Sequence, residues 1–289
     1  MKDIFVIAGP TGVGKTKISV MLAKKIDAEI INADSMQVYK GMNIGTAKIK
    51  EEEKEGVPHH LFDICDTSYD YSIFDYQKDC RELIESITSR GKKVILVGGS
   101  GLYIRAALYD YKFNEEEGRG DYSKYSNQEL YDMALEIDNN MDIHVNNRKR
   151  LERFLDKNNN GKIEEEKSLP LYDFDMIGLT TDRDNLYEII NNRVDKMIEE
   201  GLLDEVKSFY DKNDYSKAIM TAIGYKELYE YFDKTCPLEV CIDSIKQNSR
   251  RFAKRQYTFF NNQFDMKWFN TDYENINNTL DEIIEYINR

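Results

Sequence analysis

The chain has 289 residues, of which 41% are hydrophobic, so it is long enough to bury a core and to form one or two domains. Its formal net charge of −13 disfavours nonspecific binding to nucleic acid, although it leaves room for a local basic patch. The four cysteines have no C-x-x-C spacing, and no apolar run approaches the roughly 20 residues needed to cross a membrane. We therefore expect a soluble cytoplasmic protein with free thiols, without a zinc site, a disulfide framework or a membrane span.

The pattern of apolar residues predicts an α/β core. Buried strands are expected at residues 3–8, 28–34, 92–99 and 174–180, with helices at 15–25 and 73–89 between the first three strands. Strand, helix and strand in this order predict a parallel sheet with crossover helices. Further helices are expected at residues 183–200, 202–212, 222–232 and 238–260.

The middle of the chain differs from this core because it is polar and short of apolar periodicity. Two helices are expected near residues 127–137 and 146–156, flanked by loops at 114–127 and 156–168. We interpret residues 112–170 as a helical insertion. The α/β core would then comprise residues 1–111 and 171–289.

A glycine-rich turn follows the first expected strand and opens the first expected helix. It reads GPTGVGKT and fits the pattern G-x-x-x-x-G-K-[ST] in the required context. In such a loop the backbone N–H groups turn inward around phosphate oxygens, the lysine adds a positive charge, and the last hydroxyl is a ligand for Mg²⁺. The predicted phosphate-binding residues are Gly9, Pro10, Thr11, Gly12, Val13, Gly14, Lys15 and Thr16. The loop indicates a bound phosphate but not the type of reaction.

Two further polar residues are expected near this loop, because ligands gather at the carboxyl ends of strands in open α/β sheets. The strand at 28–34 ends in Asp34, which could bind metal or act as a base in the same cleft as Lys15. An aspartate in a turn or at a helix N-cap is the alternative. The segment VGGSGLY can bring the hydroxyl of Ser100 to the same edge, although a tight strand-to-helix turn would explain it equally well.

Two basic clusters stand out in this acidic chain. Residues 246–255 contain five basic residues and no acid, and helical spacing places Lys246, Arg250 and Lys254 in one row beside Arg251 and Arg255. The second cluster lies at residues 146–153. A single charge run is usually a solvated face, but two such clusters together with a phosphate loop favour a polyanion, such as an RNA backbone, as a partner.

Eight segments between about residues 4 and 269 carry a more specific pattern. They read GPTGVGKT, INADSMQVYKGMNIGTAK, VPHHLFDI, VGGSGLYIRAAL, IGLTTDRDNLY, NRVDKMIEEGLLDEV, AIGYKEL and RRFAKRQYTFF. In this order they resemble the motifs of tRNA dimethylallyltransferases, also called tRNA isopentenyltransferases. The resemblance implies a P-loop α/β core whose glycine loop binds dimethylallyl diphosphate with Mg²⁺, instead of a nucleotide.

The resemblance also implies a reaction. The dimethylallyl group would pass to the exocyclic N6 amine of the adenine just 3′ of the anticodon, in the anticodon stem-loop of a tRNA, after the base has flipped out. Asp34 resembles the family's general base, and Ser100 replaces a threonine that positions the amine. Lys15 and Thr16 would stabilise the departing diphosphate without a covalent enzyme intermediate. We expect the enzyme to act as a monomer.

The same comparison of motifs assigns binding residues. Arg183 resembles an arginine that binds the diphosphate. We expect tRNA contacts from family-like stretches and from the basic cluster at 246–255. These residues are Asp34, Ser35, Met36, Gln37, Ser100, Lys149, Arg150, Leu151, Glu152, Arg153, Arg250, Arg251, Lys254 and Arg255.

The chain also departs from the family's pattern. Val145 stands where relatives generally have proline, Thr221 where some have arginine or glutamine, and Asn261 where an arginine is usual. These departures bear on the range of RNA substrates and on tRNA affinity more than on the chemistry. Two alternatives stay open. A small-molecule or nucleotide kinase would leave the basic helix without a role. An RNA-binding descendant without catalytic activity would leave the intact Lys15, Thr16 and Asp34 unexplained.

Overall fold

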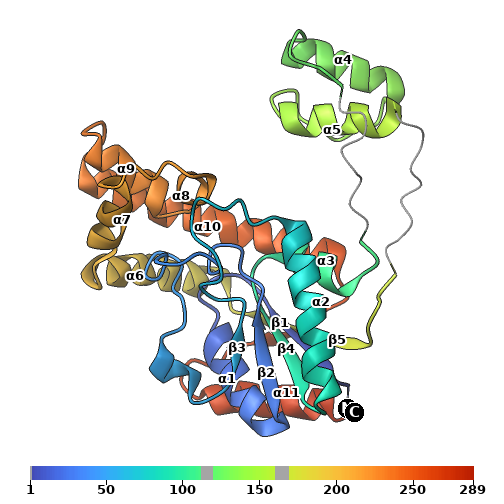
Figure 1. Ribbon diagram of the computed structural model, residues 1–289, viewed down its shortest axis with the longest axis vertical. Helices are drawn as coiled ribbons and strands as arrows, with labels where there is room; N and C mark the ends of the chain where they lie inside the picture. The colour runs from blue at the N-terminus through green and yellow to red at the C-terminus, as the bar shows by residue number, and fades with distance from the viewer. Residues whose placement is uncertain (1, 112–119, 160–168) are drawn as a thin grey trace. The chain divides into compact units, whose positions relative to one another are not determined.

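The computed structural model describes residues 2–111, 120–159 and 169–289, which form two compact units (Figure 1). Unit 1 comprises Met1–Tyr109 and Leu171–Arg289, and unit 2 is the intervening segment Asp110–Pro170. Among the described residues, no helix combines the length and the apolar character needed to cross a bilayer.

Unit 1 contains a six-stranded sheet in which every pair of neighbouring strands is parallel, as predicted. The strand order is β3-β2-β4-β1-β5-β6. The strands are β1 (Ile4–Ala8), β2 (Ala28–Asn32), β3 (His59–His60), β4 (Lys93–Gly98), β5 (Phe174–Thr180) and β6 (Lys267–Asn270). The sequence pattern did not predict β3 and β6, because β3 has only two residues and β6 has an apolar pattern too short to distinguish.

Both faces of the sheet are buried, which is why the central strand β1 (IFVIA) is apolar along its whole length. Along β1, Ile4, Val6 and Ala8 belong to one hydrophobic core, and Phe5 and Ile7 belong to the other. The first core includes α2 (Ile73–Ser89) and α3 (Gly101–Leu108), and the second includes α1 (Lys15–Ile26) and α11 (Ile276–Ile287). Figure 1 shows these two helix layers on opposite sides of the strands.

The remaining helices of unit 1 continue from the sheet. They are α6 (Arg183–Glu199), α7 (Leu202–Tyr210), α8 (Lys217–Thr221), α9 (Tyr225–Phe232) and the 26-residue α10 (Leu238–Gln263), with a short 3₁₀ helix at Glu51–Lys54. The helix expected at 222–232 begins later, at Tyr225, because Gly224 has a φ of 97°. Such an angle is outside the helical region.

Unit 2 is a helical hairpin with its own small core. Helices α4 (Asn127–Ile137) and α5 (Arg148–Asn159) bury Leu130, Leu151 and Leu155 between them. The structure therefore extends α5 into the segment 156–168, which was expected to be a loop. Residues 160–168, and residues 114–119 of the other expected loop, lie outside the described residues.

Candidate active site

The glycine loop between β1 and α1 has the backbone that an anion site requires. Gly9 has a φ of 143°, and a Cβ atom there would lie 2.4 Å from the carbonyl oxygen of Leu179 on β5. Gly14 (φ 81°) caps α1, with no side-chain hydrogen bond to the first turn. The free N–H groups and the dipole at this helix N-terminus therefore face the loop, as in other phosphate sites.

Two cationic side chains meet this loop. The Lys15 ammonium donates hydrogen bonds to the carbonyl oxygens of Gly9 (3.0 Å) and Pro10 (2.6 Å). From α6, the Arg193 guanidinium donates to the Thr11 hydroxyl (2.8 Å). Burial, and then the charge of Arg193, lower the pKa of Lys15 to about 7, while the nearby Asp34 carboxylate opposes this shift. Burial also lowers the pKa of Arg193. An anion in this position would relieve the cost of holding these two half-buried cations together.

Arg193 was not among the predicted site residues. It belongs to the motif NRVDKMIEEGLLDEV, but its position in a helix about 180 residues from the loop gave no local signal. Arg183 was predicted instead, and it is exposed at the first residue of α6, with its guanidinium 5.2 Å from the centroid of the Tyr187 ring. Ten helical residues correspond to about 15 Å along the axis, so the two arginines occupy different places. The role of Arg183 in diphosphate binding stays a prediction.

Asp34 and Ser100 come together at the carboxyl edge of the sheet because β2 and β4 are neighbours. The Ser100 N–H donates to the Ala33 carbonyl, and the Ser35 N–H donates to the Ser100 hydroxyl, both at 3.0 Å. A Cβ atom on Gly98 would lie 2.1 Å from the Ala33 oxygen, so only glycine permits this approach. The Asp34 Oδ1 atom accepts from the Met36 N–H (2.9 Å), and no hydrogen bond from the described residues reaches its Oδ2 atom.

In the segment after Asp34, side chains form hydrogen bonds with backbone N–H and carbonyl groups and hold the segment in place. The Gln37 amide donates to the carbonyl oxygens of Thr46 (2.9 Å) and Ala47 (3.4 Å). From α7, the Glu205 carboxylate accepts from the N–H groups of residues 43, 44 and 45 and from the Tyr225 hydroxyl. Met36 packs against the first hydrophobic core. The motif DSMQVYKGMNIGTAK thus forms an ordered loop beside Asp34, and Glu205 is a second residue to which sequence reasoning assigned no role.

A third unassigned residue, Gln256 on α10, connects the two glycine turns. Its Oε1 atom accepts from the Thr11 N–H (3.2 Å), and its Nε2 atom donates to the Gly99 carbonyl (3.1 Å). The only signal in the sequence was an uncharged polar residue in the basic segment RRFAKRQYTFF.

Helix α10 presents cations to solvent. Arg251, Lys254 and Arg255 are exposed. Arg250 is half-buried, with its guanidinium 5.9 Å from the centroid of the Tyr187 ring and a hydrogen bond to Asn191 on α6. Three of the four predicted RNA-binding cations of α10 are therefore exposed to solvent.

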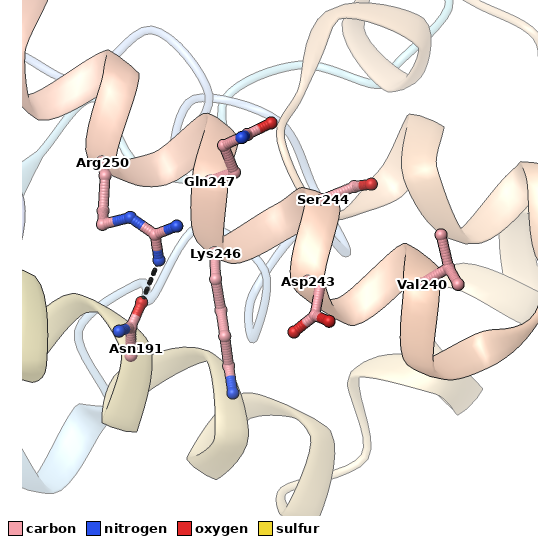
Figure 2. Close-up of a pocket in the computed structure, with 7 residues that line it drawn as sticks. All are labelled: Asn191, Val240, Asp243, Ser244, Lys246, Gln247 and Arg250. Carbon is pink, nitrogen blue, oxygen red and sulfur yellow. Dashed lines mark hydrogen bonds between the residues drawn. The ribbon is translucent and has the colours of Figure 1, made fainter.

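A polar groove of about 440 Å³ lies along α10 and α6 (Figure 2). It is lined by Asn191, Val240, Asp243, Ser244, Lys246, Gln247 and Arg250. Lys246 forms an ion pair with Asp195 at 2.6 Å, so this member of the basic row is partly neutralised. None of the lining residues belongs to the glycine loop or to the Asp34 segment, and the groove is distinct from the catalytic candidates.

In unit 2, the predicted RNA-binding stretch of α5 divides by exposure. Lys149, Arg150 and Arg153 are exposed. Leu151 is fully buried in the core of unit 2, so its side chain is not accessible to a ligand, and Glu152 forms an ion pair with Arg148 at 2.7 Å. Only the three cations are free to meet a phosphate backbone.

The donor set for a metal is small. The Thr16 side chain is exposed at the open end of α1, and Asp34 lies close enough to influence the pKa of Lys15. Within the described part of the chain, no cluster of three or more His, Cys, Asp or Glu side chains could hold a metal alone. These residues fit Mg²⁺, which commonly binds through one or two protein groups together with substrate phosphates and water.

A family model and the sequences of known proteins indicate the same family for this chain. The family model described as IPP transferase matches residues 37–263. A tRNA dimethylallyltransferase of Anoxybacillus flavithermus is 46% identical over 299 residues, covering 99% of this chain and 96% of the relative. The corresponding protein of Bacillus subtilis is 47% identical over 284 residues, covering 93% and 90%.

Solved structures of the same family have a similar fold. The full-length tRNA isopentenylpyrophosphate transferase of Bacillus halodurans superposes with a TM-score of 0.79 at 43% identity, over 99% of this chain and 96% of that one. A eukaryotic dimethylallyltransferase acting on tRNA gives a TM-score of 0.83 at 29% identity, over 98% and 78%. The family predicted from the motifs is confirmed, and the chain belongs to the tRNA dimethylallyltransferases.

Proposed function

We propose that this chain transfers the dimethylallyl group of dimethylallyl diphosphate to the N6 amine of the adenine 3′ of the anticodon in tRNA. The observation that carries the proposal is the meeting of two half-sites at one sheet edge. One is the glycine loop with Lys15 and Arg193, and the other is Asp34 with Ser100. All these residues belong to unit 1 of a single chain, so we expect a monomer to be active.

The donor half-site is suited to a leaving diphosphate. The loop N–H groups and the α1 N-terminus provide hydrogen-bond donors, and the half-buried Lys15 and Arg193 provide positive charge. When bound, Mg²⁺ at the Thr16 hydroxyl would neutralise further charge on the diphosphate. Charge develops on the diphosphate as the allylic C–O bond breaks, and this fixed array stabilises it.

The acceptor half-site is suited to an amine. The free Oδ2 atom of Asp34 can accept a hydrogen bond from the N6 amine of a flipped-out adenine, and the Ser100 hydroxyl lies on the same edge. The amine nitrogen attacks the allylic C1 atom, the C–O bond to the diphosphate breaks, and the amine proton passes to Asp34. No covalent intermediate with the protein is needed.

The RNA surface is proposed from exposed cations in each unit taken separately. In unit 1 these are Arg251, Lys254 and Arg255 on α10, together with the ordered segment Asp34–Gln37. In unit 2 they are Lys149, Arg150 and Arg153. Guanidinium and ammonium groups on helix surfaces are typical contacts to an RNA backbone.

The test is transfer of labelled dimethylallyl from its diphosphate to unmodified tRNA with adenines 3′ of the anticodon, in Mg²⁺ and without ATP. Asp34→Asn keeps the shape of the side chain and removes the base, so we expect a loss of about 10²-fold or more in rate. Asp211→Asn, an exposed position at the C-cap of α7, is the matched control and should keep full activity.

The alternatives predict different outcomes. ATP turnover without RNA, and no transfer of label, would indicate the kinase. Binding of tRNA with no transfer at any substrate ratio would indicate a non-catalytic RNA-binding protein.

A further inference from the structure

Gln256 is a buried carboxamide whose two ends are bonded to the two half-sites. Its side chain is among the few buried polar groups of the described residues, with 5% of the residue exposed. The oxygen accepts from the Thr11 N–H in the diphosphate loop, and the nitrogen donates to the carbonyl of Gly99, the residue before Ser100. Thr11 and Gly99 are 88 residues apart in sequence, and one side chain from α10 connects them.

The chemistry of this position calls for an amide. A carboxamide presents an acceptor at one end and a donor at the other, whereas an ionised carboxylate only accepts and an ammonium only donates. The fit also constrains the partner, because a Cβ atom on Gly99 would lie 2.0 Å from Nε2. A buried carbonyl or N–H left without its partner is costly, so the two hydrogen bonds hold the two turns at one separation.

We propose that Gln256 is a positioning residue that fixes the distance between the diphosphate loop and the turn carrying Ser100, and thereby the distance between donor carbon and acceptor nitrogen. The inference rests on the proposed transfer reaction. Both ends of the Gln256 amide are engaged by backbone atoms, so we assign Gln256 no contact with either substrate. Direct attack requires the reacting atoms to approach to about 3–3.5 Å, and an error of about 1 Å can lower the rate by about 10²-fold.

The test compares three variants of the full chain. Gln256→Met keeps the length and approximate volume of the side chain and removes both hydrogen bonds. Gln256→Glu keeps the acceptor for Thr11 but removes the donor for Gly99. Thr258→Ala, exposed two residues further along α10, is the control. The measurements are the single-turnover transfer rate with donor and tRNA both saturating, the Kd of each substrate, and the Tm.

We expect both Gln256 variants to lose about 10- to 100-fold in the saturated rate, with each Kd within about threefold of wild type, while Thr258→Ala is unchanged. A purely structural role would instead lower the Tm and weaken binding while leaving the saturated rate near wild type, and that result would overturn the inference. If Gln256→Met does not fold, Gln256→Glu decides between the same two outcomes. Absence of transfer by the wild type would instead refute the proposed function, and the inference with it.

Discussion

Replacing Lys15 by methionine should stabilise the substrate-free protein while it ends the reaction. Burial lowers the pKa of Lys15 from 10.5 to about 7, which means that the fold disfavours the ammonium. At about 1.4 kcal/mol per pKa unit, this gap corresponds to about 5 kcal/mol as an upper limit. The ammonium still donates to two carbonyl oxygens and is not sealed from water, so we expect a net gain of about 1–2 kcal/mol at pH 7.

The stability gained by Lys15→Met should fall as the pH rises above 7. Between about pH 7 and 10.5 the unfolded chain retains the Lys15 proton that the folded chain has released. The free energy of unfolding of the wild type therefore rises with pH in this window, because the unfolded state binds more protons. The advantage of Lys15→Met is thus largest at and below pH 7 and should largely disappear near pH 10.

The assay is urea unfolding of the wild type, Lys15→Met and Lys17→Met at several pH values between 6.5 and 10. Lys17 is exposed on the same turn of α1 and is the matched control. Addition of inorganic diphosphate should stabilise the wild type but not Lys15→Met. If Lys15→Met is less stable than the wild type at pH 7, or if the difference between them does not change with pH, burial of the ammonium does not destabilise the fold.

Three further predictions follow from the same contacts. Glu205→Ala removes the acceptor of three backbone N–H groups and should lower the free energy of unfolding by about 2–3 kcal/mol in urea, with weaker tRNA binding. Arg251→Gln and Arg255→Gln should each weaken tRNA binding similarly across sequences and lower the salt dependence of log K by about one, measured by filter binding. Gly98→Ala would place a Cβ atom 2.1 Å from the backbone oxygen of Ala33, so a backbone segment would have to shift. We expect the free energy of unfolding to fall by more than about 3 kcal/mol.

Matched controls separate these effects from general damage. Glu199→Ala and Lys234→Gln change exposed residues on α6 and after α9, and both should behave as wild type in stability and in RNA binding, respectively. Gly91→Ala has open space around its Cβ but a φ of 74°, so it should cost only about 1–2 kcal/mol. Equal losses in any variant and its control would contradict the assigned contact.

The sequence alone determined the parts of this protein that depend on local spacing. GPTGVGKT lies between a buried strand and a helix, and this order is sufficient to predict a phosphate loop. The position of Asp34 after β2 predicted its place at the carboxyl edge, because parallel strands end together. The motifs were specific enough to identify the family before any fold was known.

Other features depended on the tertiary structure, because they join residues that are far apart in the chain. Arg193 reaches Thr11 across 182 residues, and Gln256 reaches it across 245. A helical pattern shows that such a residue lies on a helix, but it does not show which loop the helix packs against. Leu151, within a basic stretch, is buried by the α4–α5 hairpin for the same reason. Burial and pairing are set by the packing partner, and only the folded chain brings that partner into contact.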